Sequence, residues 1–143
     1  MQIQQLSIFV ENKSGRLAQI TEILASANID IRAISVADTS DFGLLRLIVN
    51  KPKEAVDALK NEGVSVSLTN VIAMGINDKP GEFAKAMRIL SDSTIDVEYM
   101  YAFISRESNK AFVILRVDEA ERAIKTLTEH KISILSAEQI YGM

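Results

Sequence analysis

The sequence predicts an α+β fold that is built twice along a chain of 143 residues. Three observations predict it: a glycine-containing loop that occurs twice, an alternating apolar run before each loop, and apolar residues at helical spacing after each loop. The two loop glycines are Gly15 and Gly81. Each half of the chain is therefore expected to contain a strand, a tight loop and the start of a helix.

The segments beside the two glycines have matching patterns. Alternation of apolar and polar residues is typical of a strand buried on one face, and apolar residues three or four positions apart are typical of an amphipathic helix. The alternating residues are Leu6, Ile8 and Val10, matched by Ile72, Met74 and Ile76. The residues at helical spacing are Leu17, Ile20, Ile23, Leu24 and Ala27, matched by Phe83, Ala86, Ile89 and Leu90.

A hairpin is expected next in each half. The second strand runs to about Val36 or Ile104, and the polar segments from Asp38 to Gly43 and from Arg106 to Lys110 have the composition of turns. Third strands follow, with apolar residues at period two. Their apolar residues are Leu45, Leu47 and Val49 in the first half and Val113, Leu115 and Val117 in the second.

A second helix and a fourth strand complete each half. Pro52 suits the first turn of this helix, and Gly63 suits the left-handed residue that ends it. The helices carry Ala55, Val56 and Leu59, matched by Ala123, Ile124 and Leu127. The fourth strands carry Val64, Val66 and Leu68, matched by Ile132 and Ile134. Each half therefore has the order βαββαβ.

This order implies the ferredoxin-like arrangement, a four-stranded antiparallel sheet with both helices on one face. We expect two tandem domains of this kind, at residues 1–69 and 70–143. Because no linker separates Leu68 from Val71, the two domains are expected to pack side by side. Each leaves one sheet face without helices, and that face must be polar, covered or paired with a partner.

Composition excludes several classes of function. Hydrophobic residues make up 48% of the chain, yet no apolar run approaches the ~20 residues of a membrane span. The formal net charge is −3 and no basic run occurs, which argues against nucleic acid as a partner. The chain has no cysteine, and no signal peptide is recognised, so a cytoplasmic location is expected.

The residues also give little material for catalysis. His130 is the only histidine, and it has no aligned partner with which to act as a base or metal ligand. We therefore predict no catalytic residue, no metal site and no cofactor. Tyr99, Tyr101 and Phe103 form a stripe on one strand, which is more typical of sheet packing or self-association than of base stacking.

The repeated loop and the segment after its helix resemble the ACT domain family. The resemblance covers the whole chain as two tandem copies. Its sharpest segments are Val10-Glu11-Asn12-Lys13-Ser14-Gly15-Arg16-Leu17 with Ala27-Asn28-Ile29-Asp30-Ile31, and Asn77-Asp78-Lys79-Pro80-Gly81-Glu82-Phe83 with Thr94-Ile95-Asp96-Val97. The first repeat also resembles the ACT domain in the small subunit of acetolactate synthase, although no C-terminal region like that subunit's follows.

The resemblance implies a regulatory module that binds a free amino acid or a similar small metabolite. Ligands of the family lie between two adjacent ACT domains, held by the loop of one and the start of the second strand of the other. The residues this implies are Asn12, Lys13, Ser14, Gly15, Arg16 and Leu17 facing Asp96 and Val97, and Asp78, Lys79, Gly81, Glu82 and Phe83 facing Asp30 and Ile31.

Physical chemistry supports such a ligand, and simpler roles stay open. A helix N-terminus offers N–H groups to a carboxylate, and a glycine lets the backbone approach. Asn12 and Asp78 could equally cap the helices, and Asp30 and Asp96 could bond to nearby backbone. Ser14 stands where the family more often has proline, so the two loops are expected to bind unequally.

Two functions follow as hypotheses. The first is a non-catalytic, free-standing tandem ACT protein that forms a homodimer and binds an amino acid between its domains. An enzyme of amino-acid metabolism is a possible partner of such a protein. The alternative is a structural or regulatory subunit that docks on a metabolic enzyme through its sheet face without a ligand. The sequence names neither the amino acid nor the enzyme.

Overall fold

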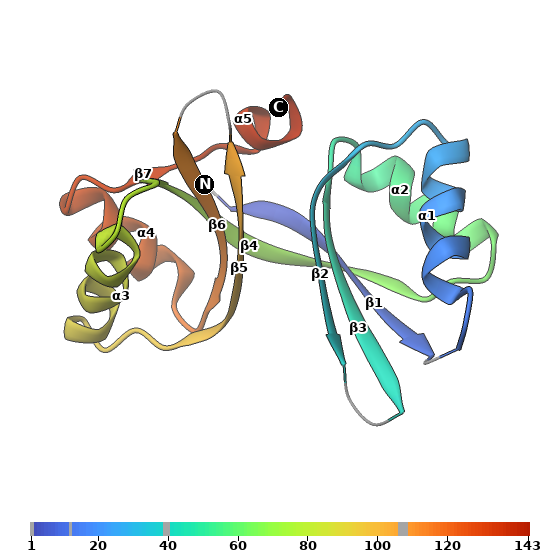
Figure 1. Ribbon diagram of the computed structural model, residues 1–143, viewed down its shortest axis with the longest axis horizontal. Helices are drawn as coiled ribbons and strands as arrows, with labels where there is room; N and C mark the ends of the chain where they lie inside the picture. The colour runs from blue at the N-terminus through green and yellow to red at the C-terminus, as the bar shows by residue number, and fades with distance from the viewer. Residues whose placement is uncertain (1, 12, 39–40, 106–108) are drawn as a thin grey trace. The chain divides into compact units, whose positions relative to one another are not determined.

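The computed structural model describes residues 2–11, 13–38, 41–105 and 109–143 of the chain (Figure 1). Its elements, in chain order, are β1 (Ile3–Glu11), α1 (Arg16–Ser26), β2 (Ile31–Asp38), β3 (Phe42–Val49), α2 (Pro52–Asn61), β4 (Val66–Asn77), α3 (Glu82–Asp92), β5 (Val97–Ser105), β6 (Lys110–Val117), α4 (Ala120–Glu129), β7 (Ser133–Ile134) and α5 (Ala137–Tyr141). The predicted βαββαβ order is confirmed in both halves, with β4 serving as the last strand of one and the first of the other.

Two compact units can be distinguished. The first unit contains Gln4–Thr69 and Ile140–Met143, and the second unit contains Asn70–Gln139 with residues 2–3. The predicted domain boundaries, 1–69 and 70–143, and the side-by-side packing stay predictions. Each unit has its own hydrophobic core.

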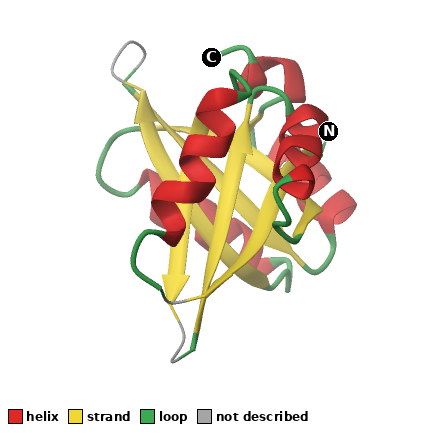
Figure 2. Cartoon of the chain, turned by 90° about the vertical axis from the view of Figure 1, so that its right-hand side faces the viewer, coloured by secondary structure: helices red, strands yellow, loops and turns green. Residues whose placement is uncertain are grey.

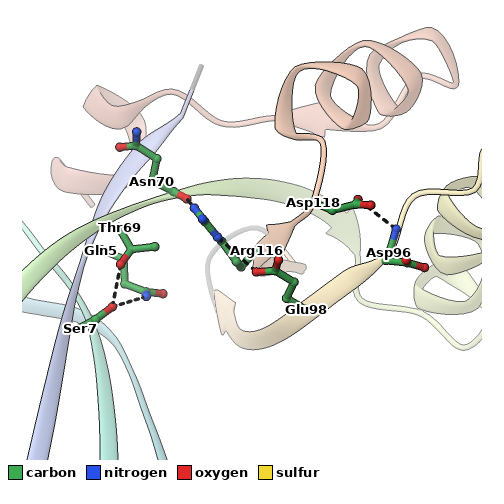
Figure 3. A network of polar contacts seen from close by, with 8 residues as sticks. All are labelled: Gln5, Ser7, Thr69, Asn70, Asp96, Glu98, Arg116 and Asp118. Atoms are coloured by element: carbon green, nitrogen blue, oxygen red, sulfur yellow. Dashed lines mark hydrogen bonds and ion pairs between the residues drawn. The ribbon is translucent and has the colours of Figure 1, made fainter.

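The sheet of the first unit has the strand order β2-β3-β1-β4. β3 pairs antiparallel with β1 and with β2, so that Leu47 lies opposite Leu6 on one side and Ile34 on the other. The beginning of β4 lies near β1, where the hydroxyls of Ser7 and Thr69 are 3.0 Å apart (Figure 3). This is the strand order of a ferredoxin-like sheet.

The core of the first unit lies between this sheet and the helices α1 and α2, which cover one sheet face (Figure 2). Alternate strand residues point into it, and each helix contributes the apolar stripe that its spacing predicts. The buried core residues are Leu6, Ile8, Val10, Ile20, Leu24, Ile29, Leu45, Leu47, Val49, Ala55, Leu59 and Val64. Full burial of one such leucine or isoleucine stabilises the fold by about 1.5–3 kcal/mol.

The second unit repeats this plan. β6 pairs with β4 and β5, and β7 pairs with β4 at Met74 and Gly75. Its helices α3 and α4 cover the core from one side. The buried core residues are Ile72, Met74, Ile76, Ala86, Ile89, Leu90, Ile95, Val113, Leu115, Val117, Ala123 and Leu127.

One continuous strand stands where the sequence analysis expected two. The fourth strand of the first half and the first strand of the second half merge into β4, which has 12 residues. No glycine or proline interrupts the chain between Val64 and Met74, so nothing locally breaks the extended backbone. The two repeats are therefore joined by strand rather than by a flexible linker.

The last helix, α5, is not signalled by the sequence pattern. Its Ile140 is fully buried in the first unit. The backbone N–H of Gln4 donates to the hydroxyl of Tyr141 at 2.9 Å, and the guanidinium of Arg32 donates to the carbonyl of Tyr141 at 3.3 and 3.2 Å. Tyr141 thus bonds to the start of β1 and to Arg32 of β2.

Several local predictions are confirmed. Pro52 is in the first turn of α2, and Gly63 follows the helix with a φ of 79°. β2 and β3 pair as the predicted first hairpin, while residues 39–40 and 106–108 of the two predicted turns lie outside the described residues. Within the described ranges, no helix is long and apolar enough to span a lipid bilayer.

Candidate functional site

The first loop, residues 13–17, connects β1 to α1. Gly15 stands directly before the helix with a φ of 87°, in the left-handed region that only glycine adopts at little cost. Its carbonyl accepts the first helical hydrogen bond, from Gln19 N–H at 3.0 Å, and Lys13 O accepts from Arg16 N–H at 3.2 Å. A Cβ at Gly15 would meet no atom within 4 Å, so the backbone angle and not crowding requires the glycine.

The second loop, residues 79–83, has the same backbone. Gly81 has a φ of 91°, its carbonyl accepts from Lys85 N–H at 3.0 Å, and Lys79 O accepts from Glu82 N–H at 3.3 Å. The matching of these two loops, expected from the sequence, is therefore seen hydrogen bond by hydrogen bond.

Among the residues that the structure describes, no side chain caps either helix. Within that part of the chain, neither α1 nor α3 receives a side-chain hydrogen bond at its N-cap, which is the loop glycine in both cases. The simpler interpretation of Asp78 as a helix cap is thus wrong, because the cap position belongs to Gly81 and the Asp78 backbone N–H donates to Asn109 O at 2.9 Å. Asn12 lies outside the described residues. The N-terminal turns of both helices retain N–H groups that a ligand oxygen could accept from.

The first loop borders a cavity of about 240 Å³. Its lining combines charged loop residues with two exposed apolar side chains, Leu17 and Val36. The lining residues are Val10, Glu11, Lys13, Ser14, Arg16, Leu17, Val36 and Gly43. A second hollow borders the same loop, and Gly15 and Gln19 are among its lining residues. Four of the predicted first-loop residues therefore share one cavity: Lys13, Ser14, Arg16 and Leu17.

The charged side chains at this cavity have polar partners close by in the chain. The ammonium of Lys13 lies 3.0 Å from the carboxylate of Glu11. The hydrogen bond from Lys13 and its positive charge lower the pKa of Glu11. Arg16 donates to the side-chain oxygen of Gln19 at 2.8 Å. One carboxylate and two cations thus stand beside the uncapped helix start.

Asp30 and Asp96 take part in matching pairs of hydrogen bonds between strand ends. Asp30 N–H donates to Asn50 Oδ1 at 2.9 Å while Asn50 N–H donates to Asp30 O at 3.1 Å. Asp96 N–H donates to Asp118 Oδ1 at 3.2 Å, and Asp118 N–H returns to Asp96 O at 3.3 Å (Figure 3). These hydrogen bonds hold the start of β2 to the end of β3, and the start of β5 to the end of β6. Asp30 and Asp96 contribute main-chain atoms to these bonds, so the predicted bonding of their own side chains to nearby backbone stays a prediction.

The side chains at these strand starts are also engaged locally. The Asp30 carboxylate pairs with Arg32 at 3.2 Å. Ile31 and Val97 are half-buried against the cores of their own units. Asp30 lines a separate hollow with Asn28 and Asn50, apart from the first loop. The predicted pairing of each loop with the strand start of the other repeat stays a prediction.

Val36 and Gly43 line the first cavity, although no loop motif of the sequence predicts them there. Gly43 lies opposite Val10 across the β1–β3 pair, and Val36 lies opposite Leu45 on the neighbouring strand. Their position depends on strand register, which the alternation of β1 and β3 indicates but which a search for loop motifs does not use.

Comparison with protein families matches the ACT domain pair over residues 1–143. Protein BT0572 from Bacteroides thetaiotaomicron is 40% identical in its crystal structure, with a TM-score of 0.94 over 100% of this chain and 98% of that one. The ligand-free regulatory subunit of aspartate kinase from Thermus thermophilus is 18% identical, with a TM-score of 0.64 over 90% of this chain and 91% of that one. The regulatory subunit from Thermus flavus is 17% identical, with a TM-score of 0.62 over 88% and 90%. The comparison with curated proteins found no match.

Proposed function

Given that this chain belongs to the ACT domain pair family, we propose that it is a non-catalytic regulatory protein whose first loop binds a free amino acid. The likeness to regulatory subunits of aspartate kinase supports a regulatory role. A cytoplasmic location and an amino-acid-metabolism enzyme as partner belong to the same proposal.

The first cavity is the observation that carries the proposal. Its volume of about 240 Å³ lies below the ~300–1,000 Å³ of drug-sized pockets and suits a small metabolite. An amino acid carries a carboxylate and an ammonium on one carbon. The uncapped start of α1 with Arg16 matches the carboxylate, and Glu11 matches the ammonium. Leu17 and Val36 offer apolar contact to a side chain.

A thermal unfolding screen against the twenty amino acids tests this proposal. A ligand at a hundred times its dissociation constant adds about 2.7 kcal/mol to the free energy of unfolding, so the unfolding midpoint should rise. The matched control is the amide of the same amino acid, which keeps the ammonium and side chain but lacks the carboxylate. It should raise the midpoint much less. If no amino acid moves the transition, and the purified protein carries no bound metabolite, the proposal fails.

The family resemblance adds the position of the ligand between two ACT domains and a homodimer. Sedimentation of the full chain with and without the active amino acid tests whether the protein is a homodimer. A species of one chain at micromolar concentration under both conditions would contradict the homodimer, and would leave the amino-acid site to the thermal screen.

The alternative function uses the sheet face that carries no helix. Tyr99, Tyr101 and Phe103 lie on that face of β5 and are half-buried, and Phe103 packs against Phe112 with ring centroids 5.4 Å apart. A subunit that docks on an enzyme through this face would stay bound when Gly15→Ala removes the geometry of the first loop. Loss of enzyme association in that variant would favour the amino-acid sensor.

A further inference from the structure

The second unit contains a polar cavity that the amino-acid site does not use. Its volume is about 210 Å³, and it lies between the start of α3, the first residue of β6 and the connection from α4 to β7. Three of its lining residues are lysines, and one is a glutamate. The lining residues are Gly75, Ile76, Asn77, Glu82, Lys85, Lys110, Lys131, Ile132 and Ser133. From this cavity we propose that the second unit binds the phosphate group of a small metabolite, or free phosphate.

The first observation behind the proposal is the convergence of positive charge. Lys85 of α3, Lys110 of β6 and Lys131 of the connection from α4 to β7 line one cavity, in a chain whose net charge is −3. In the described part of the chain, no ion pair joins any of the three to a carboxylate. Like charges that share a cavity repel one another, and a bound anion removes that repulsion.

The second observation is that the same positions of the first unit are neutral. Lys85 corresponds to Gln19, since each donates its N–H to the loop glycine. Lys110 corresponds to Phe42, since Asn77 pairs with Lys110 as Glu11 pairs with Phe42. The ferredoxin-like fold therefore does not require this cluster.

The third observation concerns the backbone of Lys131. This residue has a φ of 63° directly after α4, where the first unit has Gly63 with a φ of 79°. Lys131 N–H donates to Thr128 O and Gly63 N–H donates to Lys60 O, both at 3.0 Å, so the two positions are equivalent. A lysine in this backbone conformation lowers the free energy of unfolding by roughly 1 kcal/mol relative to glycine. The second unit keeps a lysine at a position where glycine would be more stable.

Phosphate fits this lining better than a carboxylate does. A phosphate monoester carries about −1.5 to −2 charges at pH 7, which matches several ammonium groups. Lysine binds phosphate as a point charge, and the Ser133 hydroxyl and the Asn77 amide add neutral donors. Glu82 is the one carboxylate of the lining and opposes an anion. The cavity size suits a small phosphorylated molecule.

Calorimetric titration of the full chain with inorganic phosphate and with glycerol 3-phosphate tests the proposal, in chloride buffer at fixed ionic strength. Binding of both probes would assign free phosphate, and binding of glycerol 3-phosphate alone would assign a phosphorylated metabolite. Succinate is the third probe, and should bind at least tenfold more weakly than the better phosphate probe. No binding of either phosphate probe, or equal binding of succinate, would overturn the proposal.

Two variants replace a cavity lysine by the residue that the first unit has at the equivalent position. Lys85→Gln and Lys131→Gly should each weaken binding at least tenfold, and Lys131→Gly should keep or raise the unfolding midpoint because glycine suits the backbone. Glu82→Gln should tighten binding. Lys125→Gln, at an exposed lysine of α4 outside the cavity, is the control and should change affinity less than twofold. Equal losses in Lys125→Gln and the two cavity variants would indicate non-specific attraction and overturn the site.

The phosphate site shares no residue with the first cavity. Amino-acid binding should therefore be unchanged in Lys131→Gly, and the two proposals fail independently.

Discussion

The first and second loops have one backbone and two chemistries. Both place a glycine with a φ near 90° before an uncapped helix. The first helix then begins with Arg16 and the second with Glu82, so the same position carries a positive charge in the first loop and a negative charge in the second. The two loops share the geometry that starts a helix, which is a requirement of folding, and differ in the charges beside it.

The largest expected effects come from matched core leucines. Leu24 and Leu90 are buried at equivalent positions of α1 and α3. Replacing either with alanine should lower the free energy of unfolding by about 2–5 kcal/mol, measured by urea unfolding. Two separate transitions in one variant would show that the units unfold independently. Ser91→Ala, at an exposed position, should change stability by less than about 0.5 kcal/mol.

Next come the two loop glycines. Gly15→Ala and Gly81→Ala should each cost about 1–2 kcal/mol of stability, because each forces a side chain into the left-handed region. The two variants should also differ in their response to the ligand. Only Gly15→Ala should reduce the rise in unfolding midpoint that the amino acid produces. Gly15→Asn is the control, since asparagine tolerates this conformation. Equal loss of the amino-acid response in both alanine variants would contradict the inequality of the loops.

Exchange of charge between the loops tests the electrostatic part of the comparison. Arg16→Glu gives the first helix the residue of the second, and should weaken amino-acid binding about tenfold, or about 1.4 kcal/mol. Calorimetry measures the loss. Arg88→Glu, at an exposed site on α3 of the second unit, provides the control for net charge. An unchanged affinity in Arg16→Glu would separate this arginine from the ligand carboxylate.

The smallest effect concerns the pH dependence of Glu11. Lys13 lowers its pKa in the folded chain, so the stabilising contribution is present above the ordinary pKa of a glutamate and is lost as pH falls through the lowered value. Lys13→Gln should raise the pKa of Glu11 toward its ordinary value, as NMR titration of the carboxyl carbon would show. Lys79→Gln, in the second loop, should leave it unchanged. A low pKa of Glu11 in Lys13→Gln would assign the shift to another group.

Local features of the fold were predictable because they depend on one or two residues. Gly15, Gly63 and Gly81 were expected at turns and helix ends, and a positive φ is a property of the single residue. The ACT resemblance likewise identified the first loop. The register that brings Val36 to this loop, and the contact of Tyr141 with Gln4, depend on residues far apart in the chain. Nothing in five residues of α5 signals where they pack.

The placement of residues 140–143 in the first unit affects how the chain folds during synthesis. Gln4–Thr69 leave the ribosome long before Ile140 and Tyr141, which cover the start of β1 and hold Arg32. At the usual rate of translation the interval is roughly 4 to 14 s. During that time the first unit exists without its last piece, so the first unit reaches its final stability only after the second repeat has been made.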